Sequence, residues 1–280
     1  LNFSISIYFI FSLLILFDTS LFYYLQNFIV RQTNTVELSY RGISTFSTEP
    51  GLFGGLLIFF LLVIDYCFLN KIITKINMYA LKVLVVTMIF LTKSGSGYVY
   101  FMLYLFLFLL DKDNNFSKTY ILSFFTMIFF ILARIVITED FSSYGRGFQI
   151  ITKLNNPLDL INTDTSIFSR LVNSSMSFFA IANNPFGVGN GSVISEAQII
   201  AHNNNFLNSW FKGRYVDFNS SFSYLSFSHG LIFWIFFFYL YTSFSKSKLI
   251  NKIFSMIFFI FSYSAAFPAI WVLLSLKKTK

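Results

Sequence analysis

The side chains of this sequence that could carry out chemistry lie mainly in two polar stretches, residues 31–50 and residues 138–221. They combine arginines with a histidine and a carboxylate: Arg41, Glu49, Arg146, Arg170, His202 and Arg214. Arginine binds anionic oxygens through two parallel hydrogen bonds, and histidine exchanges protons near neutral pH. Such a set suits the binding of an anionic group together with acid–base chemistry.

The longer stretch is not a basic patch. Residues 138–221 contain five Lys or Arg against six Asp or Glu, so the arginines are placed singly. A connection of this length is usually functional or disordered. Its Trp210 and its several Phe and Ile residues argue against disorder.

Residues 199–212 have the apolar periodicity of an amphipathic helix, with His202 at the boundary between its polar and apolar sides. Such a helix would lie at a membrane surface. His202 would then face a cavity at headgroup level, and the alternative is a surface histidine without a role.

Several smaller features can be explained by structure alone, without a functional role. The glycine-rich segment 183–192 lacks the strand and helix of a dinucleotide-binding loop, so it is interpreted as a turn in which Gly187, Gly189 and Gly191 allow positive φ. Arg41 and Glu49 could flank a solvated loop. His229 could hydrogen-bond a neighbouring helix, and Lys93 could anchor the chain at the interface.

The elements that would position these residues are membrane helices. Of the 280 residues, 56% are hydrophobic and 11% are charged, whereas soluble domains have about 25% charged residues. The net charge of +8 lies in short clusters beside apolar runs, which is typical of a membrane protein and argues against nucleic-acid binding. Cys67 is the single cysteine, so an intrachain disulfide is excluded.

Apolar runs predict an all-α polytopic bundle of about six or seven transmembrane helices, with short amphipathic helices in a long loop. The predicted spans are 3–17, 51–69, 77–92, 97–110, 119–137, 222–243 and 253–276. Asp65, Lys82 and Arg134 lie near span ends, where long side chains reach the interface. We favour this interpretation over a proton or ion path.

Lysines in the short connections predict the orientation, because cytoplasmic loops are enriched in Lys and Arg. The three connections that share one side carry Lys71, Lys75, Lys112, Lys118, Lys246, Lys248 and Lys252. The long loop 138–221 is therefore periplasmic. Lys277, Lys278 and Lys280 fit only if the last span breaks at Pro268 and doubles back.

We expect residues 1–280 to form a single membrane domain that contains the loop 138–221. The run 3–17 lacks the features of a cleavable signal peptide. The first residue is Leu1, which indicates either missing N-terminal helices or a non-AUG start.

An ordered set of motifs crosses the chain on the predicted outer face. It consists of R-G-x-x-T-F-x-x-E-P-G at 41–51, K-S-G-S-G at 93–97, S-R at 169–170, P-F-G-V-G at 185–189, A-H-N at 201–203 and S-H-G-L-I-F-W at 228–234. The set resembles the O-antigen polymerase and O-antigen ligase superfamily of bacterial membrane glycosyltransferases, over most of residues 36–276. The first motif favours the polymerase branch, and the ligase assignment is weakened because no aromatic residue follows Arg170 closely.

The resemblance implies that a glycan is transferred from undecaprenyl pyrophosphate to the non-reducing end of a new lipid-linked repeat unit. The transfer takes place at the periplasmic face of the inner membrane, without nucleotide sugar, cofactor or metal. The implied partners are the lipid-linked glycans, the bilayer and a chain-length regulator, and no nucleic acid.

On this resemblance, the arginines would bind the pyrophosphate leaving group, where fixed positive charge lowers the barrier. The candidates are Arg41, Arg146, Arg170 and Arg214, and Arg170 matches its motif best. His202 would be the general base for the acceptor hydroxyl, with Glu49 as the competing base.

Three alternatives remain open. An O-antigen ligase would pass the polymer to lipid A–core. A polysaccharide flippase or other transporter would place charges or broken helices in two repeats, and we find no internal repeat. A structural membrane subunit would leave the arginine and histidine set unexplained.

Overall fold

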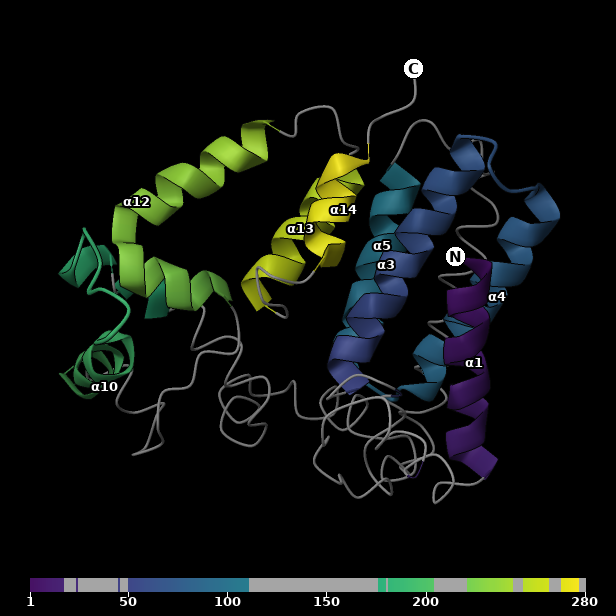
Figure 1. The fold of residues 1–280 in the computed structure, drawn as a ribbon, viewed down its shortest axis with the longest axis horizontal. Coiled ribbons are helices and arrows are strands. Elements are labelled where there is room, and N and C mark those ends of the chain that lie inside the picture. Colours follow the sequence, from purple (N-terminus) through teal and green to yellow (C-terminus); the bar gives the residue numbers. More distant parts are fainter. Residues whose placement is uncertain are drawn as a thin grey trace, which may run out of the picture. The chain divides into compact units, whose positions relative to one another are not determined.

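The computed structural model describes residues 1–17, 24, 45, 50–110, 176–179, 181–203, 221–243, 249–261 and 268–276. Within these ranges all regular structure is helical (Figure 1). The chain divides into two compact units, Leu1–Leu154 and Asn155–Lys280. The predicted span 119–137, with Arg134, and the lysines that flank it lie outside the described residues.

The first unit contains four apolar helices, α1 (Asn2–Phe17), α3 (Pro50–Leu69), α4 (Lys75–Leu91) and α5 (Gly95–Leu110). Their bounds confirm that helices occupy the runs predicted at 3–17, 51–69, 77–92 and 97–110. Pro50 begins α3, at a position where its missing N–H costs no helical hydrogen bond. Thr74 caps α4, because its hydroxyl accepts a hydrogen bond from the Asn77 N–H at 3.3 Å.

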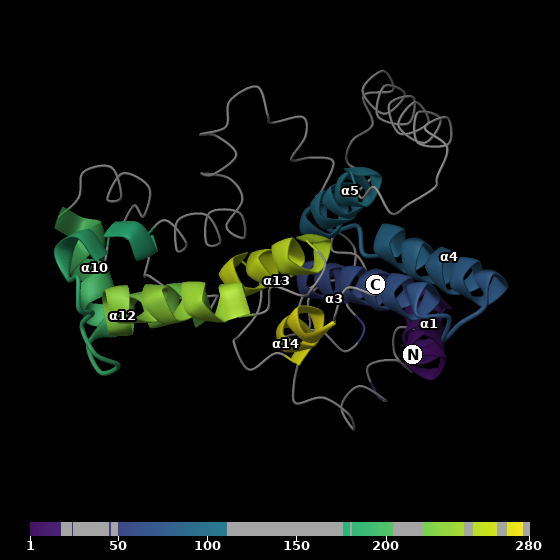
Figure 2. The ribbon, with the colours of Figure 1, turned by 90° about the horizontal axis from the view of Figure 1, so that it is seen from above.

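Helix α3 is the centre of the first unit, with contacts to both α4 and α5 (Figures 1 and 2). Its buried side chains include Phe53, Leu57, Leu61 and Ile64. Helix α1 packs against α4, and its Tyr8 ring stacks on Phe53 with ring centroids 5.6 Å apart.

Two glycines allow α3 and α5 to approach closely. A Cβ atom built on Gly54 would lie 2.6 Å from the Gly97 Cα, well inside contact distance. Small residues at such crossings let the backbones of apolar helices touch. The second glycine belongs to the K-S-G-S-G motif at 93–97, which ends at the first residue of the span predicted at 97–110. In the structure, Lys93 has φ 46° and α5 already begins at Gly95.

The second unit contains α10 (Val193–Asn203), α12 (Ser221–Ser243), α13 (Leu249–Phe261) and α14 (Pro268–Ser275). Helix α12 is broken at Gly230, where φ is 55° and ψ is −136°, and its two arms form a V (Figure 1). Ring contacts cross the V, with the Phe222 and Phe237 centroids 5.5 Å apart. A straight helix would separate these two residues by about 22 Å.

The predicted span 222–243 is matched in length and composition, but it is not one straight helix. The arms of α12 measure about 14 and 20 Å at 1.5 Å per residue. Each is shorter than the hydrocarbon core, which is about 30 Å thick.

The prediction of one helix over 253–276 is wrong. The structure has α13 and α14 in its place, packed against each other, and the Ser255 hydroxyl donates to the Ile270 carbonyl at 3.3 Å. Helix α14 begins at Pro268, which lacks the N–H needed to continue a preceding helix. The break at Pro268 is the one that the lysines of the C-terminal tail suggested.

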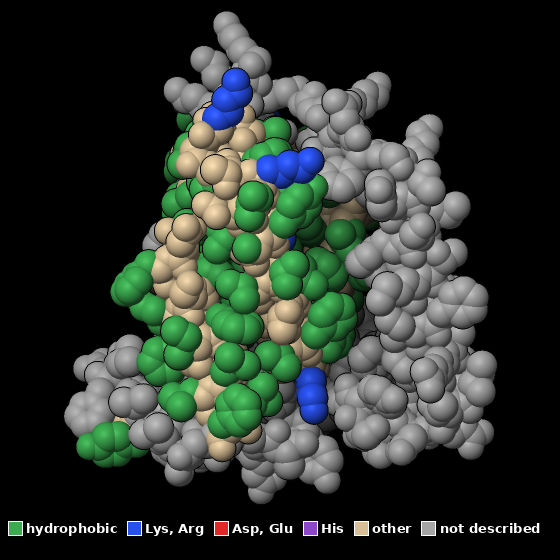
Figure 3. All heavy atoms as spheres, turned by 90° about the vertical axis from the view of Figure 1, so that its right-hand side faces the viewer, with side chains coloured by type: hydrophobic (Ala, Val, Ile, Leu, Met, Phe, Trp, Pro, Cys, Tyr) green, Lys and Arg blue, Asp and Glu red, His purple; other side chains and the backbone are tan. Residues whose placement is uncertain are grey.

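Two helical stretches, Gly51–Leu69 and Ser221–Thr242, are long and apolar enough to cross a membrane, judged by length and composition. In the first unit, hydrophobic side chains cover the face shown in Figure 3, with Lys or Arg side chains toward its two ends. The exposed lysines of the described part of this unit are Lys71, Lys75 and Lys93, which lie just before and just after the body of α4.

Candidate functional site

Of the six residues predicted to form the site, the structure describes His202. Arg41, Glu49, Arg146, Arg170 and Arg214 lie outside the described residues. The positions of His202, His229 and the glycine-rich segment can therefore be compared with the sequence predictions, and all of them belong to the second unit.

His202 lies at the C-terminal end of α10 and is exposed. The helix begins at Val193, earlier than the predicted amphipathic helix 199–212, and residues 204–212 are outside the described part. The buried side of α10 consists of Val193, Ala197, Ile200 and Ala201, which pack with Met176 and Phe227. Ile199, an apolar residue of the predicted amphipathic helix, is 49% exposed.

The glycine-rich segment joins the break in α12 through its backbone. The Val188 N–H donates to the Phe227 carbonyl at 3.0 Å, and the Gly189 N–H donates to the Ser228 carbonyl at 3.1 Å. In the opposite direction, the Leu231 N–H donates to the Pro185 carbonyl at 2.8 Å. We call residues 185–189 together with 227–231 the α12 joint. Its two segments form with each other hydrogen bonds that the break in the helix would otherwise leave unsatisfied.

Two glycines make the α12 joint sterically tight. A Cβ on Gly230 would lie 2.2 Å from the Pro185 carbonyl oxygen, and a Cβ on Gly187 would lie 2.4 Å from the Ser228 carbonyl oxygen. Gly187 and Gly189 have positive φ as the turn interpretation predicted, whereas Gly191 does not. The turn prediction is confirmed at the first two glycines, whereas the packing of this turn against a helix was not predicted.

His229 lies within the α12 joint, directly before Gly230. Its ring is exposed, and its Nδ1 is 2.5 Å from the Ser228 hydroxyl oxygen. The Ser228 hydroxyl also contacts the Leu225 carbonyl at 3.3 Å. The hydrogen bond expected between His229 and a neighbouring helix is therefore made within α12 itself.

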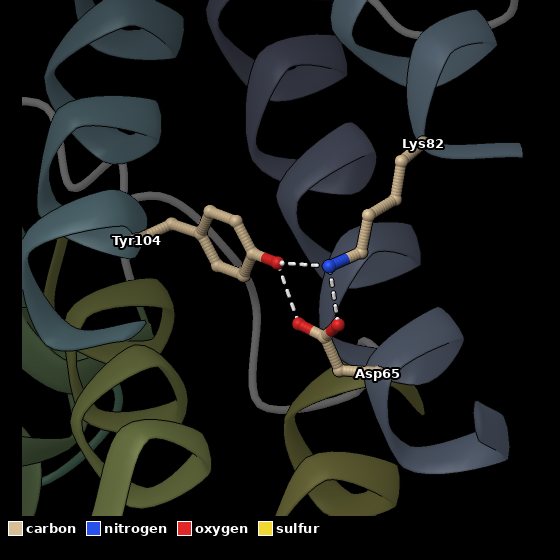
Figure 4. Close-up of polar contacts among 3 residues, drawn as sticks. All are labelled: Asp65, Lys82 and Tyr104. Carbon is tan, nitrogen blue, oxygen red and sulfur yellow. Dashed lines mark hydrogen bonds and ion pairs between the residues drawn. The ribbon is translucent and has the colours of Figure 1, made fainter. Parts of the chain in front are cut away.

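A second polar cluster lies in the first unit and links three helices (Figure 4). The Lys82 ammonium of α4 is 2.5 Å from a carboxylate oxygen of Asp65 on α3. The Tyr104 hydroxyl of α5 donates to the other carboxylate oxygen at 2.5 Å and accepts from Lys82 at 3.2 Å. The Lys82 ammonium also lies 4.8 Å from the centroid of the Phe108 ring.

This polar triad, Asp65, Lys82 and Tyr104, pairs two of the charges that were predicted near span ends, and this pairing was not predicted. The Asp65 and Lys82 side chains are 17% and 20% exposed, and they neutralise each other. The sequence contained a signal for the pair, since the two opposite charges lie at similar distances from the short turn between consecutive spans. Helices that run in opposite directions from such a turn place those positions at the same depth.

Among the described residues, no group of three or more His, Cys, Asp and Glu could hold a metal ion. Compared with protein-family models, with curated proteins and with solved structures, the chain has no match.

Proposed function

We propose that this chain is a polytopic protein of the bacterial inner membrane that polymerises lipid-linked oligosaccharide repeat units at the periplasmic face. The substrates are glycans on undecaprenyl pyrophosphate, and the product is an O-antigen or capsular polysaccharide. The proposal extends the resemblance to the O-antigen polymerases described above.

The observation that carries the proposal is the gathering of three motifs in the second unit. P-F-G-V-G at 185–189 hydrogen-bonds to the backbone of S-H-G at 228–230, and the helix that ends in A-H-N at 201–203 packs on Phe227. Segments that are separated by about 40 residues in the sequence thus form one structure around the break in α12.

The membrane setting is supported by the apolar helices. Helix α3 has the length of a span, and α1, α4 and α5 have 16 to 17 residues, near the lower limit for crossing a bilayer. In the second arm of α12, Ile232, Ile235, Phe236 and Tyr239 are all more than half exposed. A hydrocarbon environment is the one in which such side chains carry no cost.

In the proposed reaction, a hydroxyl of the acceptor sugar attacks the anomeric carbon of the donor glycan. The bond between that carbon and the phosphate oxygen breaks, and undecaprenyl pyrophosphate leaves. His202 takes the hydroxyl proton, with Glu49 as the competing base, and the arginines stabilise the charge that develops on the phosphate. Arg170 is the foremost of the four arginines, with Arg41, Arg146 and Arg214 beside it.

The test is complementation. We expect a strain lacking this gene to carry core with a single repeat unit, and the wild-type gene to restore a ladder of chain lengths on a gel. His202→Ala and Arg170→Ala should be present in the membrane at the wild-type level and should give single repeats only. Normal ladders from both variants would contradict the assigned site.

The same experiment separates the ligase alternative. A ligase null would carry bare core, and finished polymer would accumulate on its lipid carrier. A polymerase null accumulates no polymer in any fraction, so extraction of the lipid-linked pool decides between the two activities.

One alternative of a different class, a polysaccharide transporter, gains support from two observations. The polar triad places an ion pair inside an apolar helical unit, and α12 is broken by a glycine; both features occur in transporters. A transporter predicts that the repeat unit remains on the cytoplasmic leaflet of the null strain. Detection of single repeats on core in that strain would exclude it, because the repeat must already have crossed the membrane.

A further inference from the structure

The α12 joint holds an imidazole that the predicted site does not use. Irregular backbone at membrane depth occurs where it is buried in protein or lines a polar cavity, and broken helices often line binding sites. In the α12 joint, the exchanged hydrogen bonds satisfy the Phe227 and Ser228 carbonyls and the Leu231 N–H. The exposed polar side chain at the break is His229.

The position of His229 is fixed by the backbone on both sides. A Cβ on Gly187 would lie 2.7 Å from the His229 backbone nitrogen, and a Cβ on Gly230 would lie 2.8 Å from the Phe186 carbonyl carbon. There is no room for the two segments of the α12 joint to move closer together. An imidazole on such a backbone, with its Nδ1 2.5 Å from the Ser228 hydroxyl oxygen, loses little further freedom when it binds a ligand.

The two contacts of Ser228 favour one of the two neutral tautomers of the His229 ring. A serine hydroxyl has one proton, and the Leu225 carbonyl can only accept it. Both contacts of Ser228 are satisfied together when its hydroxyl donates to Leu225 and the His229 Nδ1–H donates to the Ser228 oxygen. The Nε2 atom of the neutral ring then carries a lone pair, and among the described residues it has no hydrogen-bond partner.

We infer that His229 binds the glycan substrate by accepting a hydrogen bond at Nε2 from a sugar hydroxyl. This inference rests on the proposed function and adds a substrate-binding residue to it, distinct from the general base His202. A neutral imidazole that only accepts through its exposed nitrogen selects a hydroxyl over an anionic group, so the phosphate remains with the arginines.

The first test measures the tautomer. The chain has two histidines, so His202→Gln leaves the His229 signal alone in a ¹⁵N spectrum of the protein in lipid nanodiscs. At a pH where the ring is neutral, we expect the proton on Nδ1, and we expect the Nε2 resonance to shift when the lipid-linked repeat unit is added. A proton on Nε2, or no shift, would overturn the inference.

The second test measures kinetics with the lipid-linked repeat unit extracted from the strain lacking this gene. In His229→Leu, loss of one hydrogen bond should raise KM about fivefold to tenfold, with kcat close to that of the wild type. Ser228→Ala, which frees the ring, should raise KM less. Ser226→Ala is the matched control, because its hydroxyl contacts Trp234 at 2.9 Å and not the imidazole; its KM should not change.

The outcomes distinguish this inference from the proposed function. If the wild type forms polymer and the folded His229→Leu protein has an unchanged KM, the role of His229 is overturned. The proposed function is not affected by that result. Failure of the wild type to polymerise the repeat unit would overturn the proposed function and, with it, the glycan as the ligand of His229. A wild-type melting temperature for His229→Leu shows that a raised KM is not due to misfolding.

Discussion

At the scale of single residues, the polar triad is the feature whose energetics can be measured most directly. Lys82 and Asp65 neutralise each other, and Tyr104 contacts both. Breaking a buried pair by removing one partner costs about 3–5 kcal/mol, because the remaining charge stays buried. Here both side chains are partly exposed, so the effect should be smaller.

We predict that Lys82→Met lowers the free energy of unfolding by about 2 kcal/mol, because it leaves the Asp65 carboxylate unpaired among apolar helices. The double variant Asp65→Asn, Lys82→Met should recover a large part of this loss. Thermal unfolding in one detergent compares the wild type, Lys82→Met, Asp65→Asn and the double variant. Additive losses in the double variant would show that the two charges do not interact. Tyr104→Phe should cost about 1 kcal/mol.

At the scale of elements, the α12 joint depends on glycine for two reasons, positive φ and close backbone contact. One series of variants can distinguish them. Gly187 and Gly230 combine positive φ with close backbone contact, Gly189 has positive φ in open space, and Gly191 has open space with ordinary φ. The left-handed conformation costs a side chain about 1–2 kcal/mol, and forced overlap adds about 1–3 kcal/mol.

We predict that alanine at Gly187 or Gly230 destabilises the second unit by about 2–5 kcal/mol. Alanine at Gly189 should cost about 1–2 kcal/mol, and alanine at Gly191 should be neutral. Melting temperatures and limited proteolysis of the purified variants give the order. Equal effects at Gly187 and Gly189 would mean that the loop does not pack against α12.

At the scale of the whole molecule, the proposed orientation places the turn before α4 in the cytoplasm and the turn after it in the periplasm. Cys67 is the only cysteine, so Cys67→Ser gives a background free of thiols. In this background, Lys93→Cys should react with an impermeant maleimide on cells whose outer membrane has been permeabilised. Ile72→Cys, at a position that is 65% exposed, should react only after the inner membrane is opened. The opposite result would invert the orientation and move the predicted site to the cytoplasmic face.

The positions of α1, α3, α4 and α5 could be predicted from sequence because each follows a mainly apolar run of residues, and the length of such a run can be measured without knowing the rest of the fold. The break in α12 could not be predicted in this way, because Gly230 is held open by a loop some 40 residues earlier in the chain. Pairing of Asp65 with Lys82 was within reach of the sequence, whereas the contribution of Tyr104 depends on how α5 packs against α3. The lysines of the C-terminal tail indicated a break at Pro268 as an alternative to one span, and in the structure α14 begins at that residue.

The three hydrogen bonds that join residues 185–189 to α12 run between main-chain atoms, and this has a consequence for how such a chain can diverge. Within the loop, Gly187 is held by close backbone contact, and the Val188 side chain packs against the cluster that contains Met176 and Phe227. Phe186 is 79% exposed, and Gly189 would admit a larger residue for the cost of its φ alone. Mutations can therefore accumulate in this loop while its shape persists, and saturation mutagenesis of residues 185–189 should tolerate most substitutions at 186 and almost none at 187.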